Sequence, residues 1–97
     1  MVEHILLMRW KDEASQGAID NALAELRGLK SKIAGIVDLS CGVNFSERAK
    51  GYTHALVIRF ADRPSLEAYF PHPEHRRVVQ SVINPIRADT LILDYEI

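Results

Sequence analysis

Apolar and polar residues alternate along four stretches of the chain, which predicts four β-strands. These stretches cover residues 2–10, 36–43, 52–60 and 90–97. The polar, turn-rich residues 44–51 separate the second stretch from the third, and they predict a long hairpin loop. The strands therefore fall near both ends and in the middle of the chain.

Apolar residues that recur every three or four positions predict a helix between the first two strands. These residues are Ile19, Leu23, Leu26, Leu29 and Ile33. Ser15 stands where an N-cap is needed, and Gly35 follows the last apolar position.

A second helical region lies between residues 62 and 84 and is expected to be broken in two. Asp62 is a candidate N-cap for a short helix over residues 66–70. Pro71 and Pro73 interrupt the pattern, and Pro73 suits the first turn of the next helix.

The elements follow the order β-α-β-β-α-β, which predicts an α+β fold in a single domain, residues 1–97. Short connections in this order favour one antiparallel sheet with the helices on one face. In a ferredoxin-like arrangement of this order, the first and third strands lie side by side in the centre.

Both faces of the two central strands are apolar, which is unusual for a sheet with one face in water. One face carries Leu6, Met8, Leu56 and Ile58, and the other carries Ile5, Leu7, Ala55 and Val57. The helices can cover only one of them. We therefore expect the other face to pair with a second copy, forming a homodimer.

Charge and composition narrow the classes of partner. The chain has 12 basic and 13 acidic residues, a net charge of −1 and no basic stripe, so nucleic acid is not expected as a partner. The longest apolar run, residues 5–8, is too short to span a bilayer, so no membrane partner and a cytoplasmic location are expected. Cys41 is the only cysteine, which excludes an internal disulfide.

Several short segments match one family in order and spacing. They are VEHILL at 2–7, GVNF at 42–45, GYTHA at 51–55, YFPHPEH at 69–75 and the pair Asp94-Tyr95. With these segments the chain resembles the stress-responsive A/B barrel (Dabb) family. The resemblance implies a dimeric α+β barrel of ferredoxin-like protomers, in a family where many members have no known role.

One plant branch of that family is a polyketide cyclase that needs no cofactor. Its two strand histidines match His4 and His54, and its helix tyrosine and histidine match Tyr69 and His75. The resemblance implies that His75 removes a proton from an activated carbon while Tyr69 polarises the acceptor carbonyl. His4 and His54 would orient the substrate.

If the two strand histidines face the helices, all four side chains converge on one mostly apolar pocket in each protomer. Its expected walls are Leu6, Met8, Leu23, Leu56, Ile58 and Val79. The leading hypothesis is a protein that binds a small apolar or poly-keto ligand there. A cofactor-free acid/base enzyme is the alternative, because histidine can act as both base and acid near neutral pH.

Two other interpretations of the histidines remain. His72 and His75 are three residues apart and, with Glu74, have the donor atoms of a metal site. The prolines break that segment and no other ligand pair supports it, so no metal is expected. In the other interpretation, the four candidate residues serve only packing and capping in a structural or stress-protective oligomer.

Overall fold

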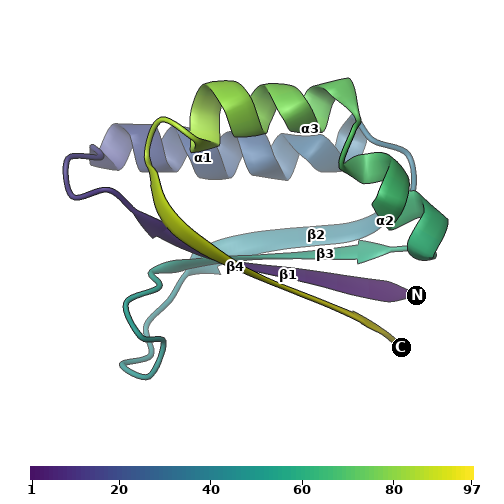
Figure 1. Cartoon of the computed structure of the whole chain (residues 1–97), viewed down its shortest axis with the longest axis horizontal. Helices are drawn as coiled ribbons and strands as arrows, with labels where there is room; N and C mark the ends of the chain where they lie inside the picture. The colour runs from purple at the N-terminus through teal and green to yellow at the C-terminus, as the bar shows by residue number, and fades with distance from the viewer.

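The computed structural model describes residues 1–97, and its core is one four-stranded antiparallel sheet (Figure 1). The strands are β1 (Val2–Trp10), β2 (Ile36–Val43), β3 (His54–Phe60) and β4 (Arg87–Glu96). Their order across the sheet is β2-β3-β1-β4. The first and third strands are therefore the central pair, which confirms the predicted ferredoxin-like arrangement.

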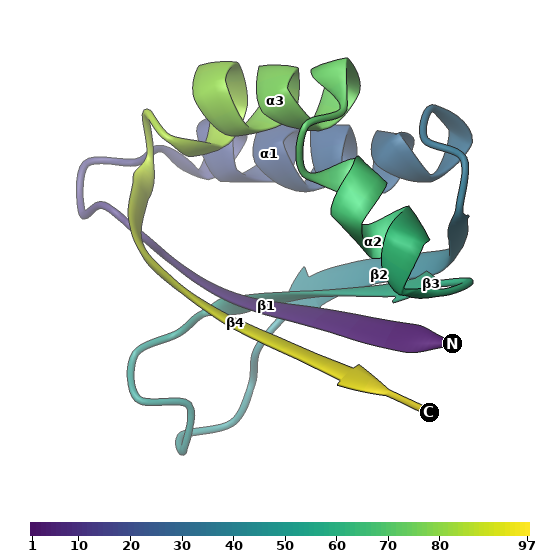
Figure 2. The same cartoon turned by 45° about the vertical axis from the view of Figure 1, so that its right-hand side comes forward.

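The helices all lie on one face of the sheet (Figures 1 and 2). They are α1 (Gln16–Gly28), α2 (Arg63–Tyr69) and α3 (Pro73–Val78); a 3-10 turn η1 (Leu29–Ser31) extends α1, and a π-helical segment η2 (Val79–Ile83) extends α3. The break between α2 and α3 is where the two prolines predicted it. None of these helices has both the length and the apolar character needed to cross a membrane.

Side chains cap the helix starts as the sequence suggests. The Ser15 hydroxyl accepts a hydrogen bond from the Ala18 amide at 3.1 Å, and the Asp62 carboxylate accepts one from the Ser65 amide at 2.9 Å. His72 has the same role at α3, because its Nδ1 accepts from the Glu74 amide at 3.1 Å.

Several boundaries differ from the prediction. Strand β4 begins at Arg87 rather than residue 90, and α2 begins at Arg63 rather than residue 66. The α-helical geometry ends at Gly28 rather than near Ile33, although Leu29 and Ile33 are still buried beneath the 3-10 turn. The third strand begins at His54 rather than Tyr52, because the Thr53 carbonyl accepts from the Asn44 amide at 2.8 Å and closes the loop instead of extending the ladder.

The register decides which side chains lie under the helices. His4 pairs with Ile58 of β3 and Asp94 of β4, and Met8 pairs with His54. Even-numbered residues of β1 and β3 therefore face the helices. Most of the buried core comes from this face, from α1 and from the helices that follow β3.

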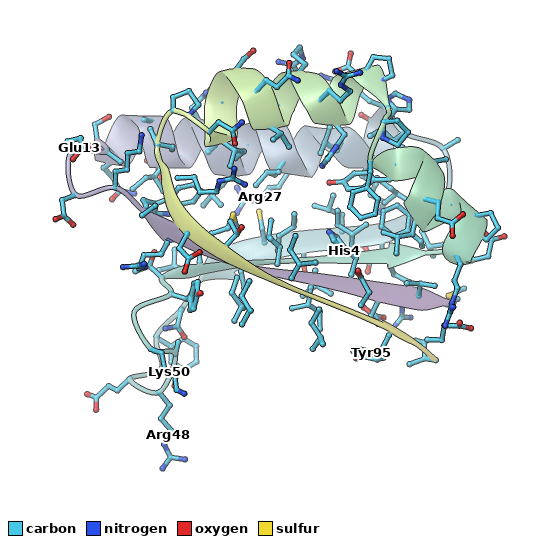
Figure 3. The ribbon with its side chains drawn as sticks, viewed as in Figure 1. His4, Glu13, Arg27, Arg48, Lys50 and Tyr95 are labelled. Atoms are coloured by element: carbon cyan, nitrogen blue, oxygen red, sulfur yellow. The ribbon has the colours of Figure 1, made fainter.

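The opposite face of the sheet has no covering element. Leu91 and Leu93 of β4 are 53% and 58% exposed there, beside the half-buried Ile5 and Leu7 of β1. The loop between β2 and β3 projects on this side, with Arg48 and Lys50 near its tip (Figure 3). A large apolar surface is therefore open to solvent in the isolated protomer.

Replacing Gly35 by alanine is expected to destabilise the fold by about 1–3 kcal/mol. Gly35 has φ +94°, which L-residues rarely adopt, and an added Cβ would lie 2.8 Å from the Ser65 Cβ. Gly28→Ala is the matched control: that site is helical and has open space, so about 0.5 kcal/mol of stabilisation is expected. Urea unfolding of both variants measures the difference, and equal stabilities would contradict this account.

Candidate functional site

His4 is a buried histidine surrounded by aromatic rings on the helix side of the sheet (Figure 3). Its side chain comes from the central strand β1, and the residue is only 3% exposed. The rings of Phe60, Tyr69 and Phe70 meet it edge to face, with centroids 6.2, 5.9 and 5.8 Å away. An imidazole so deep in an apolar layer needs a polar partner.

That partner is Asp94, which stands directly opposite His4 on β4. The His4 Nδ1 and the Asp94 Oδ1 are 2.5 Å apart. Because a carboxylate oxygen accepts, Nδ1 is the donating nitrogen, and the other ring nitrogen, Nε2, has no partner in the chain. Asp94 also lines a cavity of about 240 Å³ between β4 and α2, with Val2 and Leu66. Asp94 therefore contacts the buried His4 ring on one side and a surface cavity on the other.

Tyr69 and His75 complete this cluster from the helix side. Tyr69 ends α2 and His75 lies in the first turns of α3, and the break between the two helices lets their rings pack with centroids 4.1 Å apart. The His75 Nδ1 lies 3.0 Å from the Phe70 carbonyl oxygen, which can only accept. The proton is therefore on Nδ1, and Nε2 keeps a free lone pair.

Burial sets the protonation states of these two groups. It lowers the pKa of His75, and the nearby His4 and His72 lower it further, against the opposing effect of the Phe70 carbonyl. The imidazole is therefore neutral at pH 7. Burial also raises the pKa of Tyr69, so its phenol stays protonated. The site thus pairs a neutral base with a neutral hydrogen-bond donor.

The Tyr69 hydroxyl makes no hydrogen bond within the chain. Tyr69 is only 2% exposed, and since no fully buried side-chain nitrogen or oxygen lacks a partner, its hydroxyl keeps only a slight exposure to solvent. The same holds for Nε2 of His4 and of His75. The cluster, which we call the His4–Tyr69–His75 site, therefore presents three polar atoms with free hydrogen-bonding capacity inside an aromatic shell.

His54 does not join this site, although the sequence grouped it there. It pairs with Met8, four residues along β1 from His4, which corresponds to about 13 Å at the rise of a strand. Its Nδ1 accepts from the Trp10 indole at 2.9 Å and lies 2.7 Å from the Thr53 hydroxyl. The two strand histidines face the same layer, as expected, but they lie at opposite ends of it.

The six residues expected to line a pocket between sheet and helices are packed instead. Met8 and Ile58 are fully buried, Leu56 is 1% exposed, and the side chains of both layers fill the space. The six residues are Leu6, Met8, Leu23, Leu56, Ile58 and Val79. None of them lines any of the four main cavities of the protomer. A cavity of about 440 Å³ lies instead between the uncovered face of the sheet and the loop that joins β2 to β3.

Sequence reasoning missed Asp94 and Phe70 as parts of the site. Asp94 gave a signal, because it is a charged residue at a helix-facing position directly after the apolar run 91–93 of β4. Phe70 gave none, since its place above His4 depends on how α2 and α3 meet. No three His, Cys, Asp or Glu side chains come together as a metal site would require.

Comparison with known proteins agrees with this architecture. The family model of the stress responsive A/B barrel domain matches residues 2–97. The chain belongs to this family. It is 29% identical over 96 residues to a stress-response A/B barrel domain-containing protein of Arabidopsis thaliana, and the match covers 98% of this chain but only 36% of the plant protein. This A/B barrel chain therefore spans about a third of that relative's length.

Other relatives have named activities. Olivetolic acid cyclase of Cannabis sativa is 25% identical over 76 residues, covering 76% of this chain and 75% of the cyclase. The structure of a hydroxynitrile lyase from Passiflora edulis superposes on this A/B barrel with a TM-score of 0.91, 25% identity and coverage of 99% and 92% of the two chains. A dimeric ferredoxin-like protein of unknown function from Thermobifida fusca superposes with a TM-score of 0.86, 25% identity and coverage of 99% and 90%.

Proposed function

We propose that this A/B barrel protein binds a small carbonyl compound at the His4–Tyr69–His75 site and moves protons on it without a cofactor. The observation that carries the proposal is the meeting of a neutral imidazole and a neutral phenol, ring centroids 4.1 Å apart, with both functional atoms unpartnered. A purely structural cluster satisfies its polar atoms internally. This one leaves three of them free.

The chemistry follows from which atom has a proton. His75 Nε2 takes a proton from the carbon next to a carbonyl, and the electron pair left behind attacks a second carbonyl carbon. Tyr69 donates a hydrogen bond to the oxygen of that second carbonyl as it becomes negative. His75 then returns its proton to the same oxygen. The result is an aldol-type bond with no external oxidant or metal.

His4 and Asp94 have a supporting role in this proposal. The 2.5 Å contact holds the His4 ring in one orientation, so that Nε2 stays available to the substrate as an acceptor.

Phe70 is 41% exposed and packs against both His4 and His75. We propose that its ring moves aside to admit substrate, because the apolar layer behind the site is already filled.

The relatives support this chemical class and leave the substrate open. One relative is named as a cyclase and one structural neighbour as a hydroxynitrile lyase, so two proteins similar to this chain are named as enzymes that act on small organic compounds. The match to the cyclase covers about three quarters of this chain. An apolar or poly-keto compound is therefore the first substrate class to assay.

Tyr69→Phe is expected to lower kcat on a poly-keto substrate by about 10²–10³, because it removes the hydrogen bond to the developing oxyanion. The ring stays, so packing against His4 and Phe60 is preserved and the melting temperature should change little. Tyr52→Phe is the matched control, since that hydroxyl bonds Asp89 on the surface far from the site. Full activity of Tyr69→Phe would point to the alternative, a purely structural cluster.

We further propose that the protein is a homodimer in which the two uncovered sheet faces pack together. The exposed Leu91 and Leu93 and the half-buried Leu7 supply an apolar contact surface, and structural neighbours such as the Thermobifida fusca protein are dimers. An ion pair between Glu3 and Arg59, 2.6 Å long, lies on the same face and would be enclosed. Sedimentation at micromolar concentration should give twice the chain's 11.0 kDa mass.

A further inference from the structure

His54 is a buried histidine that the proposed reaction leaves unused. It is 7% exposed, and its Nδ1 is occupied by the Trp10 indole at 2.9 Å and the Thr53 hydroxyl at 2.7 Å. An indole N–H can only donate, so Nδ1 is the unprotonated nitrogen. The proton of the neutral ring is therefore on Nε2, and the tautomer is set by the surrounding residues.

The Nε2–H of His54 makes no hydrogen bond within the chain. Because no fully buried side-chain nitrogen or oxygen is unpartnered, this N–H is reachable from outside. Burial lowers the pKa of His54, and the Asp20 carboxylate of α1 opposes that shift. Gln16 and Ile19 of α1 line the same cleft as His54. A nine-tenths buried ring thus offers one fixed donor near the start of α1.

His54 lines an open cleft of about 730 Å³ at this end of the sheet, and it also borders the cavity of about 440 Å³ beside the loop between β2 and β3. The end of β1, the start of α1 and the turn before β3 form the open cleft, and we call it the Trp10–His54 cleft. Trp10 and Ile19 provide apolar surface, while Gln16 and Thr53 are polar. Its volume is in the range of small-molecule sites, while its lining is mostly polar or charged, with Trp10, Ile19 and Ala88 as the apolar residues.

The charges around the cleft balance. The lining includes two cations, Arg9 and Lys11, and two anions, Asp12 and Glu13. Arg9 is also held by Asp89 at 3.7 Å, and the Lys11 ammonium donates to a backbone carbonyl at 3.3 Å. The formal charges of these four lining residues sum to zero, so the cleft favours a neutral ligand over a strongly charged one.

We infer that the Trp10–His54 cleft is a second small-molecule site, separate from the His4–Tyr69–His75 site, for a neutral compound with a carbonyl oxygen beside a flat apolar group. The carbonyl accepts from the His54 Nε2–H, and the flat group packs on Trp10 and Ile19. The unsatisfied donor gives orientation, and the apolar surface gives most of the affinity.

Acetophenone is a suitable probe because it joins a carbonyl to a flat ring. Titration of the ¹⁵N-labelled protein should shift the His54 ring nitrogens and the Trp10 indole signal along one saturable curve. Ethylbenzene, which lacks the carbonyl, should bind about tenfold more weakly. Equal shifts from both compounds, or shifts confined to His75 and Tyr69, would overturn the proposal.

Two variants separate the donor from the packing. His54→Leu should weaken acetophenone binding about tenfold, while His54→Gln, whose amide both accepts from Trp10 and donates outward, should restore most of it. His54→Leu also leaves the Trp10 indole unpaired, so the dispersion of the amide spectrum is used to check that this variant folds. If His54→Leu does not fold, His54→Gln decides the outcome. Binding equal to wild type in folded His54→Leu, or none in folded His54→Gln, contradicts the inference. His75→Ala should leave this binding unchanged, so the test does not depend on the proposed function.

Discussion

Replacing Leu7 by glutamate is expected to convert the proposed dimer into a monomer. Leu7 lies in the middle of the uncovered face, on the central strand β1, between Ala55 of β3 and Leu91 of β4. Pairing two such faces would enclose one carboxylate from each protomer without a partner, at a cost of several kcal/mol per charge. The loss should appear as a halved mass in light scattering at micromolar concentration.

Ile92→Glu is the matched control for Leu7→Glu. Ile92 is also an aliphatic strand residue and pairs with Leu6, but it lies on the helix side of the edge strand and is 54% exposed. The same charge placed there should leave the dimer intact. A folded Leu7→Glu protein that keeps the dimer mass would show that this sheet face is not the interface.

His75→Ala is expected to lower kcat on a poly-keto substrate by about 10²–10⁴, the usual contribution of a general base. The pH dependence gives a second readout. Because the pKa of His75 lies below its ordinary value of 6.5, the basic form is already present at pH 7. As pH falls, wild-type activity should therefore decline at a lower pH than for an unperturbed histidine base, as Nε2 becomes protonated.

His72→Ala controls for the loss of a histidine in the same segment. His72 caps α3 and is not part of the aromatic cluster, so its removal should cost about 1 kcal/mol of stability and little activity. If His72→Ala and His75→Ala lose activity equally, the loss reflects damage to α3. If neither loses activity, His75 is not the base.

The helix break shows how far local pattern predicts the site. Pro71 and Pro73 predicted an interruption between two short helices, and Tyr69 and His75 flank it as expected. Proline removes a backbone donor and restricts its neighbours wherever it stands, so this effect is local and readable from the chain. The contact between the two rings depends on the turn that the break adopts.

The position of His54 shows where local pattern fails. Alternation along β1 and β3 correctly placed both strand histidines on the same face of the sheet. Alternation has a period of two residues and contains no information about which residues of two strands stand opposite each other. The pairing of His54 with Met8 separates the two histidines along the sheet, and it places His54 against Trp10 instead.

The uncovered sheet face and the βαββαβ order were determined by the sequence alone, because periodicity and breaker residues act within a few positions of the chain. The tertiary structure decided the partner of His4, which is Asp94, ninety residues away. It also decided that the layer between sheet and helices is filled, since packing depends on how side-chain volumes from separate elements fit together. Partners and cavities are long-range properties, and only the folded chain brings their parts into contact.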